Sequence, residues 1–272
     1  MIAPLRRFLT IFTLVSRIPI RLDFVADFSR ADFWLPLIGP LASVAALAGF
    51  AAGRLLFGDN PAALLLAVLV AIAFQYAAFN LFHLDGLLDT ADAMLPVAEP
   101  ERRLEILKDS RIGVYAFAVG LVCLALRAAA LLALARMGDS AVLAALLAAP
   151  AAGRAAAALV PLLAAPARPG GLGALMRGFS PLRLAAGLML ALLPLALLVP
   201  FEGSRAIVLP LIVGAAVTAI VACLLVGYAV ARLYRRRVGG FTGDALGCAV
   251  EIGELLVLLA LVALLPRIGG VQ

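Results

Sequence analysis

Seven long apolar segments constrain the fold of this chain more than any other feature of its sequence. A run of about 20 apolar residues is long enough to cross the hydrocarbon core of a bilayer as a helix. The segments cover approximately residues 33–57, 61–82, 113–135, 141–164, 184–200, 206–230 and 246–265. Their length and their richness in Ala and Leu argue against β-strands. The sequence therefore predicts an all-α, polytopic membrane helix bundle with about seven transmembrane helices, in a single domain over residues 1–272.

The basic residues predict the orientation of this bundle. In a soluble protein a net charge of +6 would suggest nucleic acid, but this chain is 65% hydrophobic, so the distribution of charge matters more. Sixteen of the 22 Lys and Arg residues lie in residues 1–32, 84–112, 166–183 and 231–244. Arg54, Arg136, Arg205 and Arg267 lie at the opposite helix ends, and Arg127 and Arg154 lie within spans. This bias predicts that the amino terminus lies inside, at the cytoplasmic face, and that the carboxyl terminus lies outside. Membrane lipid is an expected partner, and nucleic acid is not.

The first residues differ in character from the seven spans. Arg6 and Arg7 precede a short apolar run, which resembles the first half of a signal peptide. A small-residue cleavage site is missing, and Arg17 and Pro19 interrupt the run. We interpret residues 5–18 as an amphipathic or re-entrant helix at the cytoplasmic face.

Three acids follow directly on the second apolar segment. Asp85, Asp89 and Asp92 are separated by steps of four and three residues, which keep them within a narrow arc of a helix. A solvated helix end is the simpler interpretation, but acids at the carboxyl end oppose the helix dipole. Charge is costly at a membrane boundary, so the cluster indicates a bound cation. Hard oxygen ligands suit Mg²⁺, which proteins usually share with phosphate.

Other acids are expected at the same end of the bundle. Asp109 begins the third span, and Asp244 follows a Gly-rich turn. Glu251 and Glu254 lie one to two turns inside the last span, with Glu251 on the same helix face as Asp244. Two alternatives remain open: Asp109 can be a helix N-cap, and the two glutamates can pair with the two arginines within spans.

Several further residues are candidates for binding phosphate. Arg102, Lys108 and Arg111 follow the Asp cluster, and arginine grips phosphate through two N–H groups. Thr242 and Gly243 belong to a turn whose backbone N–H groups could approach an anion at the helix start.

Two polar residues inside apolar surroundings are also candidates. Arg154 follows Gly153 in an otherwise apolar span and is hard to explain by packing. His83, the only histidine, fits a boundary residue better than a general base. Together with the acids, these groups form the set that phosphoryl transfer needs, in which positioning and charge neutralisation dominate. A site within a membrane implies that at least one substrate is amphiphilic.

The motifs resemble those of the cobalamin synthase family, the adenosylcobinamide-GDP ribazoletransferases. The matching segments are 33–39, 83–92, 108–115, 153–154 and 240–247, followed by Glu251 and Glu254. They span nearly the whole chain in the same order. Ala93-Met94 and Ala116 stand where the family often has Gly-Phe and Gly, which leaves the carboxylates untouched.

The resemblance implies a Mg²⁺-dependent transferase of cobalamin biosynthesis in the bacterial inner membrane. It would join the activated corrinoid of adenosylcobinamide-GDP to α-ribazole, or to its 5′-phosphate, and release GMP. Its active site would face the cytoplasm, and a homo-oligomer is compatible with this interpretation. The expected metal ligands are Asp85, Asp89, Asp92 and Asp244. The catalytic candidates are Asp89, Asp109 and Glu251, of which Asp109 and Glu251 are candidates for the general base.

Two rival functions also use acids in membranes. An intramembrane prenyltransferase would need a pair of Asp-rich motifs, whereas this chain has one. A cation-coupled transporter would be expected to show midplane acids and internal repeats. Release of GMP from a GDP-activated corrinoid would separate the three functions.

Overall fold

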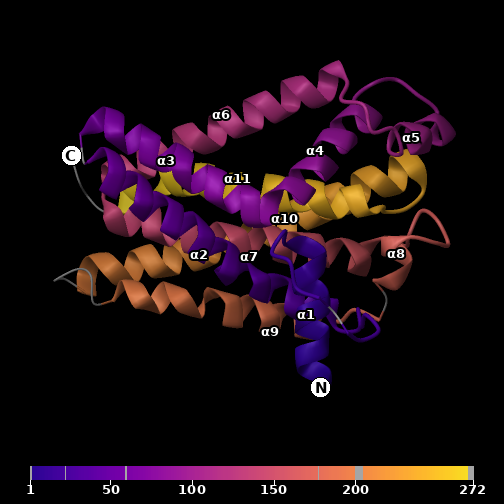
Figure 1. The fold of residues 1–272 in the computed structure, drawn as a ribbon, viewed down its shortest axis with the longest axis horizontal. Coiled ribbons are helices and arrows are strands. Elements are labelled where there is room, and N and C mark those ends of the chain that lie inside the picture. The colour runs from indigo at the N-terminus through magenta and orange to yellow at the C-terminus, as the bar shows by residue number, and fades with distance from the viewer. Residues whose placement is uncertain (1, 22, 59, 177, 200–204, 269–272) are drawn as a thin grey trace.

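The computed structural model describes residues 2–21, 23–58, 60–176, 178–199 and 205–268. All regular elements in these ranges are helical (Figure 1). They are α1 Ala3–Val15, α2 Ala31–Phe57, α3 Pro61–Gln75, the π-helical turn η1 Tyr76–Asn80, α4 Leu81–Met94, α5 Pro100–Ile106, α6 Val114–Met137, α7 Asp139–Leu163, α8 Leu172–Leu175, α9 Pro181–Leu192, the 3₁₀ segment η2 Leu193–Leu198, α10 Arg205–Val238 and α11 Gly243–Ile268.

Seven of these helical stretches are long and apolar enough to cross a membrane, which confirms the predicted polytopic bundle. The second stretch runs through α3, η1 and α4 to Met94. The apolar pattern predicted an end near residue 82, but the helix continues to Met94 along α11, against which α4 packs closely. Likewise α10 continues to Val238, so its basic run is helical and not part of a loop. Residue 200, the expected end of the fifth span, lies outside the described ranges.

The amino-terminal helix α1 lies across the long helices, as the amphipathic pattern predicted (Figure 1). Ile11, Phe12 and Val15 are buried, while the start of the helix is exposed. Phe12 meets Phe79 of η1 edge to face, with 5.9 Å between the ring centroids. The helix ends at Val15, before residue 18, because the backbone turns extended at Ser16 ahead of Pro19.

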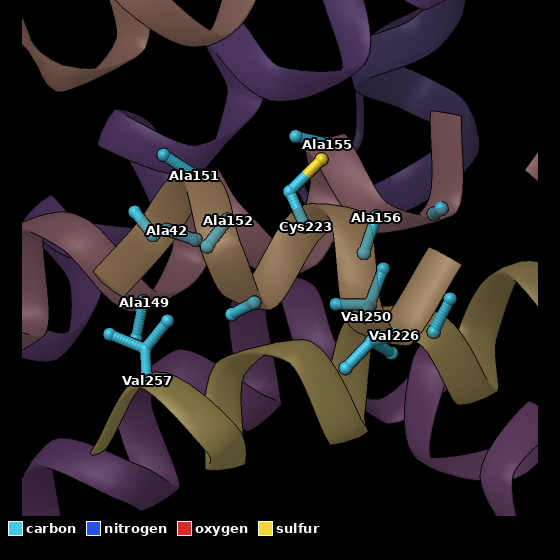
Figure 2. Packing of buried hydrophobic residues seen from close by; sticks show 14 of the residues in the cluster. Ala42, Ala149, Ala151, Ala152, Ala155, Ala156, Cys223, Val226, Val250 and Val257 are labelled. Carbon is cyan, nitrogen blue, oxygen red and sulfur yellow. The ribbon is translucent and has the colours of Figure 1, made fainter. Parts of the chain in front are cut away.

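Helix α7 forms the centre of the bundle, where 89% of its most apolar stretch is buried. Its surface consists largely of alanines, which lie against α2, α10 and α11 (Figure 2). A methyl group on Gly153 would stand 2.5 Å from the Val250 carbonyl oxygen of α11. Small residues let the backbones approach, so dispersion between helices replaces the hydrophobic driving force that lipid removes.

Close backbone approach at glycines also joins α4 to α11. A Cβ on Gly86 would lie 2.9 Å from the Asp244 carbonyl oxygen and 3.1 Å from Gly247 Cα. A Cβ on Gly247 would lie 2.8 Å from the His83 carbonyl oxygen. The two helices therefore cross glycine against glycine, which brings Asp244 beside the helix that carries the Asp cluster.

The orientation of the bundle stays a prediction that labelling can test. Val97, between α4 and α5, is fully exposed. Met137 is the last residue of α6, at the end of that helix away from α5, and is 44% exposed. In a background without native cysteines, Val97→Cys should react with an impermeant maleimide only after the cytoplasmic face is opened. Met137→Cys should react from outside in intact cells. The reverse pattern would invert the topology.

Candidate active site

Asp85 and Asp89 lie one turn apart on α4, at the end of the bundle where α5 and α8 also lie (Figure 1). Asp85 is exposed and Asp89 is partly buried. Among the described residues neither carboxylate has an ion-pair or hydrogen-bond partner. Asp89 instead experiences the negative charges of Asp85, Asp92 and Asp244. Such an uncompensated group of carboxylates is electrostatically suited to a cation.

Asp244 is held in place at the first turn of α11. Thr242 Oγ1 donates a hydrogen bond to Asp244 Oδ2 at 2.9 Å. Thr90 of α4 lies 3.5 Å from the Asp244 carbonyl oxygen and shares a 2.7 Å hydrogen bond with Tyr234 of α10. Three helices thus fix the position of this carboxylate relative to Asp85 and Asp89.

A pocket of about 160 Å³ opens beside Asp244. Thr242 and Gly243 form one wall, and Arg168 and the adjacent glycines form another. The two walls are joined by backbone hydrogen bonds of 2.9 Å, from Ala167 N–H to Phe241 O and from Phe241 N–H to Ala165 O. The volume is below the range typical of whole small-molecule sites, so it suits a phosphate or a ribose rather than a complete nucleotide.

Arg168 is a site residue that sequence reasoning missed. Its guanidinium donates to the Leu104 carbonyl oxygen at 2.5 Å and interacts electrostatically with Asp244. The available signal was an arginine inside a Pro/Gly-rich segment at the same end of the bundle as the Asp cluster. Its proximity to residue 244 depends on the tertiary fold.

Asp92 is engaged differently from the other acids of the cluster. Its carboxylate accepts backbone N–H groups of Gly113 at 2.6 Å and Ala116 at 2.9 Å. It therefore stabilises the amino terminus of α6, where unpaired N–H groups favour an anion. This contact gives Asp92 a structural function, so it is less available than Asp85 and Asp89 as the expected metal ligand.

Asp109 is poorly suited to the predicted role of general base. Arg111 grips its carboxylate through Nε at 2.9 Å and Nη2 at 2.6 Å. These hydrogen bonds lower the pKa of Asp109 to about 2, whereas a general base works best near the operating pH. The same contact raises the pKa of Arg111 and occupies its guanidinium.

The other predicted phosphate-binding residues lie nearby but outside the pocket wall. Arg102 forms an exposed 2.8 Å ion pair with Glu105 on α5. Lys108 is exposed and follows Leu107, which lines the pocket. Arg103, buried beside them, donates to the carbonyl oxygens of Ala93 and Pro96 and so holds α5 against the end of α4.

A second polar cluster lies in the interior of the bundle. It joins residues of α3, η1, α6, α7 and α11, all of them buried. Its members are Gln75, Tyr76, Asn80, Arg127, Arg154, Glu251 and Glu254. With two arginines and two glutamates, this interior network is electrically neutral.

The contacts of the interior network are close. Arg127 lies 3.0 Å from Glu251 and 2.7 Å from Glu254, and Arg154 lies 2.8 Å from Glu254. Asn80 Nδ2 donates to both glutamates, and its oxygen accepts from Arg154 at 3.0 Å. Pairing of this kind is how intramembrane charges are tolerated.

The network argues against two of the predicted site roles. Glu251 was expected as a catalytic acid or base, but it is only 3% exposed. Its carboxylate pairs with Arg127 and accepts hydrogen bonds from Tyr76 and Asn80. Arg154 was expected to bind substrate, but it is fully buried on Glu254. His83 lies outside this network: it is buried, and among the described residues neither ring nitrogen has a partner, so its contact with substrate stays a prediction. The alternative of structural pairing holds for both glutamates.

The acidic site can be tested for its fit to Mg²⁺. In the described part of the chain no three Asp, Glu, His or Cys side chains are close enough to enclose a metal ion. Mg²⁺ is usually held by one or two carboxylates with water and substrate phosphates, and not by a complete protein cage. Unpaired Asp85 and Asp89, with Asp244 opposite, match that open type of site.

The fold and the site together define a multi-pass membrane enzyme whose acidic site lies at one end of the helix bundle. Residues 7–262 match the model of the cobalamin-5-phosphate synthase family, and the chain belongs to this family. Relatives named adenosylcobinamide-GDP ribazoletransferase from Brucella ovis, Brucella canis and Brucella suis are each 36% identical over 256 residues. These matches cover 91% of this chain and 93% of each relative. No solved structure matches the chain significantly.

Loss of one network charge should destabilise the fold. Glu254→Gln removes the negative charge that faces both Arg127 and Arg154, and breaking a buried ion pair costs about 3–5 kcal/mol. We expect the thermal unfolding midpoint in detergent to fall by roughly 10 °C. Glu105→Gln, which breaks an exposed pair, is the matched control and should leave the midpoint unchanged. Equal midpoints for both variants would contradict a structural function of the network.

Proposed function

We propose that this chain transfers the cobinamide phosphoryl group of adenosylcobinamide-GDP to α-ribazole or its 5′-phosphate. A ribose hydroxyl oxygen forms the new bond to the phosphorus that carries cobinamide. The pyrophosphate bond to GMP breaks, and the hydroxyl loses its proton. The products are adenosylcobalamin, or its 5′-phosphate, and GMP. Family membership and the names of the relatives support this reaction.

The observation that carries the proposal is the meeting of unpaired carboxylates with a phosphate-sized pocket. Asp85 and Asp89 of α4 lie beside Asp244 of α11, and the pocket next to Asp244 contains Arg168. Acids that can share a cation with phosphate, and an arginine that can bind phosphate, are what phosphoryl transfer requires.

Within this site each residue has a separate function. Asp85 and Asp89, with Asp244 opposite, would hold Mg²⁺ together with water and substrate phosphates, and the bound ion would neutralise charge that develops on the pyrophosphate. Arg168 would bind a phosphate oxygen in the pocket, and Thr242 keeps the Asp244 carboxylate oriented. The pocket admits only part of the substrate, so the corrinoid would remain outside it. We place this end of the bundle at the cytoplasmic face of the inner membrane, where the basic residues gather. The single Asp-rich motif does not support a prenyltransferase. Glu251 and Glu254, which lie deep in the bundle, are paired with arginines and so do not offer a transporter's free cation ligands.

The reaction can be tested with purified protein, a GDP-activated corrinoid and α-ribazole. GMP release should require both substrates and Mg²⁺, and EDTA should abolish it. Asp89→Asn should lower turnover at least ~100-fold, because charge stabilisation in the site supplies much of the rate. Asp92→Asn is the matched comparison: it should lower the unfolding midpoint but keep the dependence on Mg²⁺ concentration. Near-native turnover of Asp89→Asn at low Mg²⁺ would refute the ligand assignment.

Arg168 provides a test of the pocket itself. Arg168→Gln should raise KM for the corrinoid nucleotide about tenfold, since a charge-assisted hydrogen bond to phosphate is lost. The Mg²⁺ requirement should not change, and Arg168→Lys should recover part of the loss. Arg136→Gln, at the other end of the bundle, serves as the charge-matched control. An unchanged KM in Arg168→Gln would exclude phosphate binding in this pocket.

A further inference from the structure

We propose that a basic pocket at the end of α10 binds the headgroup phosphate of an anionic phospholipid. The pocket measures about 340 Å³ and is lined by Leu163, Tyr228, Ala231, Arg232, Arg235 and Arg236. It is separate from the acidic site and does not depend on the proposed reaction. Basic pockets between transmembrane helices on the cytoplasmic side are suited to anionic lipid headgroups.

The charge of this pocket is uncompensated. Arg232 donates to the Tyr228 hydroxyl at 3.1 Å, and Arg235 donates to the Leu163 carbonyl oxygen at 3.4 Å. Both partners are neutral, and no Asp or Glu is among the lining residues. All three arginines are exposed, so their remaining N–H groups can face an anion. A phosphate would supply the acceptor oxygens that these groups lack.

An apolar track leads along α10 to the arginines. Val213, Val217, Val221 and Leu225 follow one another at steps of four residues, and each is at least 46% exposed. Tyr228 continues the track with 54% exposure and places its hydroxyl at the level expected for membrane-interface tyrosines. From Val213 to Tyr228 the track is about 22 Å long, more than half of a hydrocarbon core of roughly 30 Å. An acyl chain on this track would place its phosphate at the arginines.

Another basic pocket of the protein differs because some of its arginines are paired with carboxylates. It contains Arg7, Arg30 and Arg183 beside Trp34. There Arg7 pairs with Asp27 at 3.2 Å and Arg183 pairs with Asp32 at 3.0 Å. Two of the three arginines there already face a carboxylate, so we expect that pocket to bind an anion less tightly.

The test is a lipid titration of the full-length protein by native mass spectrometry. The probes are phosphatidylglycerol and, at equal concentration, zwitterionic phosphatidylcholine. One phosphatidylglycerol should bind more tightly than any phosphatidylcholine. The triple variant R232Q/R235Q/R236Q should lose this preference, at about fivefold in affinity for each arginine near the membrane surface. The single variant R232Q should show a partial loss, which keeps the test valid if the triple variant is unstable.

The control removes the same charge from the same face. R17Q/R21Q/R30Q also eliminates three exposed cytoplasmic arginines, and it should retain the preference for phosphatidylglycerol. Equal loss in both triple variants would show a general surface charge effect and overturn the pocket. Displacement of the lipid by millimolar inorganic phosphate or GMP would identify a site for soluble phosphates instead. Dimers that form without lipid and bury α10 would assign the track to a second copy of the chain and also overturn the proposal.

Discussion

The interior network of two arginines and two glutamates is the interaction on which the rest of the structure depends. Glu254 lies about 16 Å along α11 from its first residue, which is near the middle of a hydrocarbon core of roughly 30 Å. A single charge at that depth is costly, so each member requires the others. Arg127 comes from α6, Arg154 from α7 and Asn80 from η1, so the network determines which helix faces meet. Satisfying these groups in lipid therefore also sets the relative rotation of the helices.

That arrangement determines the geometry of the acidic site. On α11, Glu251 follows Asp244 by seven residues. On the neighbouring stretch of η1 and α4, Asn80 precedes Asp85 by five residues. When Asn80 and Glu251 pair in the interior, Asp85 and Asp244 are brought together nearer the end of the bundle. There Gly86 and Gly247 allow the two backbones to approach closely. The π-helical turn at Tyr76–Asn80 lies between α3 and α4 and turns Tyr76 and Asn80 toward Glu251. Such turns are frequent near functional sites because they rotate the following residues without breaking the helix.

The two charged regions at the end of the bundle differ in what they lack. At the acidic site, Asp85 and Asp89 have no ion-pair partner among the described residues and lie near a small pocket, which favours a cation shared with phosphate. On α10, arginines gather without acids above an apolar track, which favours an anionic amphiphile. One substrate of the proposed reaction is itself a large amphiphile, and a protein held firmly in the lipid interface can receive it there. In the two proposals, attachment to the membrane and chemistry thus use separate surfaces.

Local pattern was sufficient for much of this protein. The seven spans follow from length and hydropathy, because a helix satisfies its own backbone in lipid whatever its neighbours are. The Asp85 and Asp89 face follows from helical spacing, and the motifs identified the family.

Tertiary structure decided the rest. The sequence could not show that Asp92 caps α6, that Arg111 occupies Asp109 or that Glu251 is paired. Nor could it place Arg168 beside Asp244. A carboxylate has the same appearance in a sequence whether it faces a metal, an N–H group or an arginine. Only the packing of distant helices selects the partner, because the free energy of a buried charge depends on what lies within a few ångströms of it.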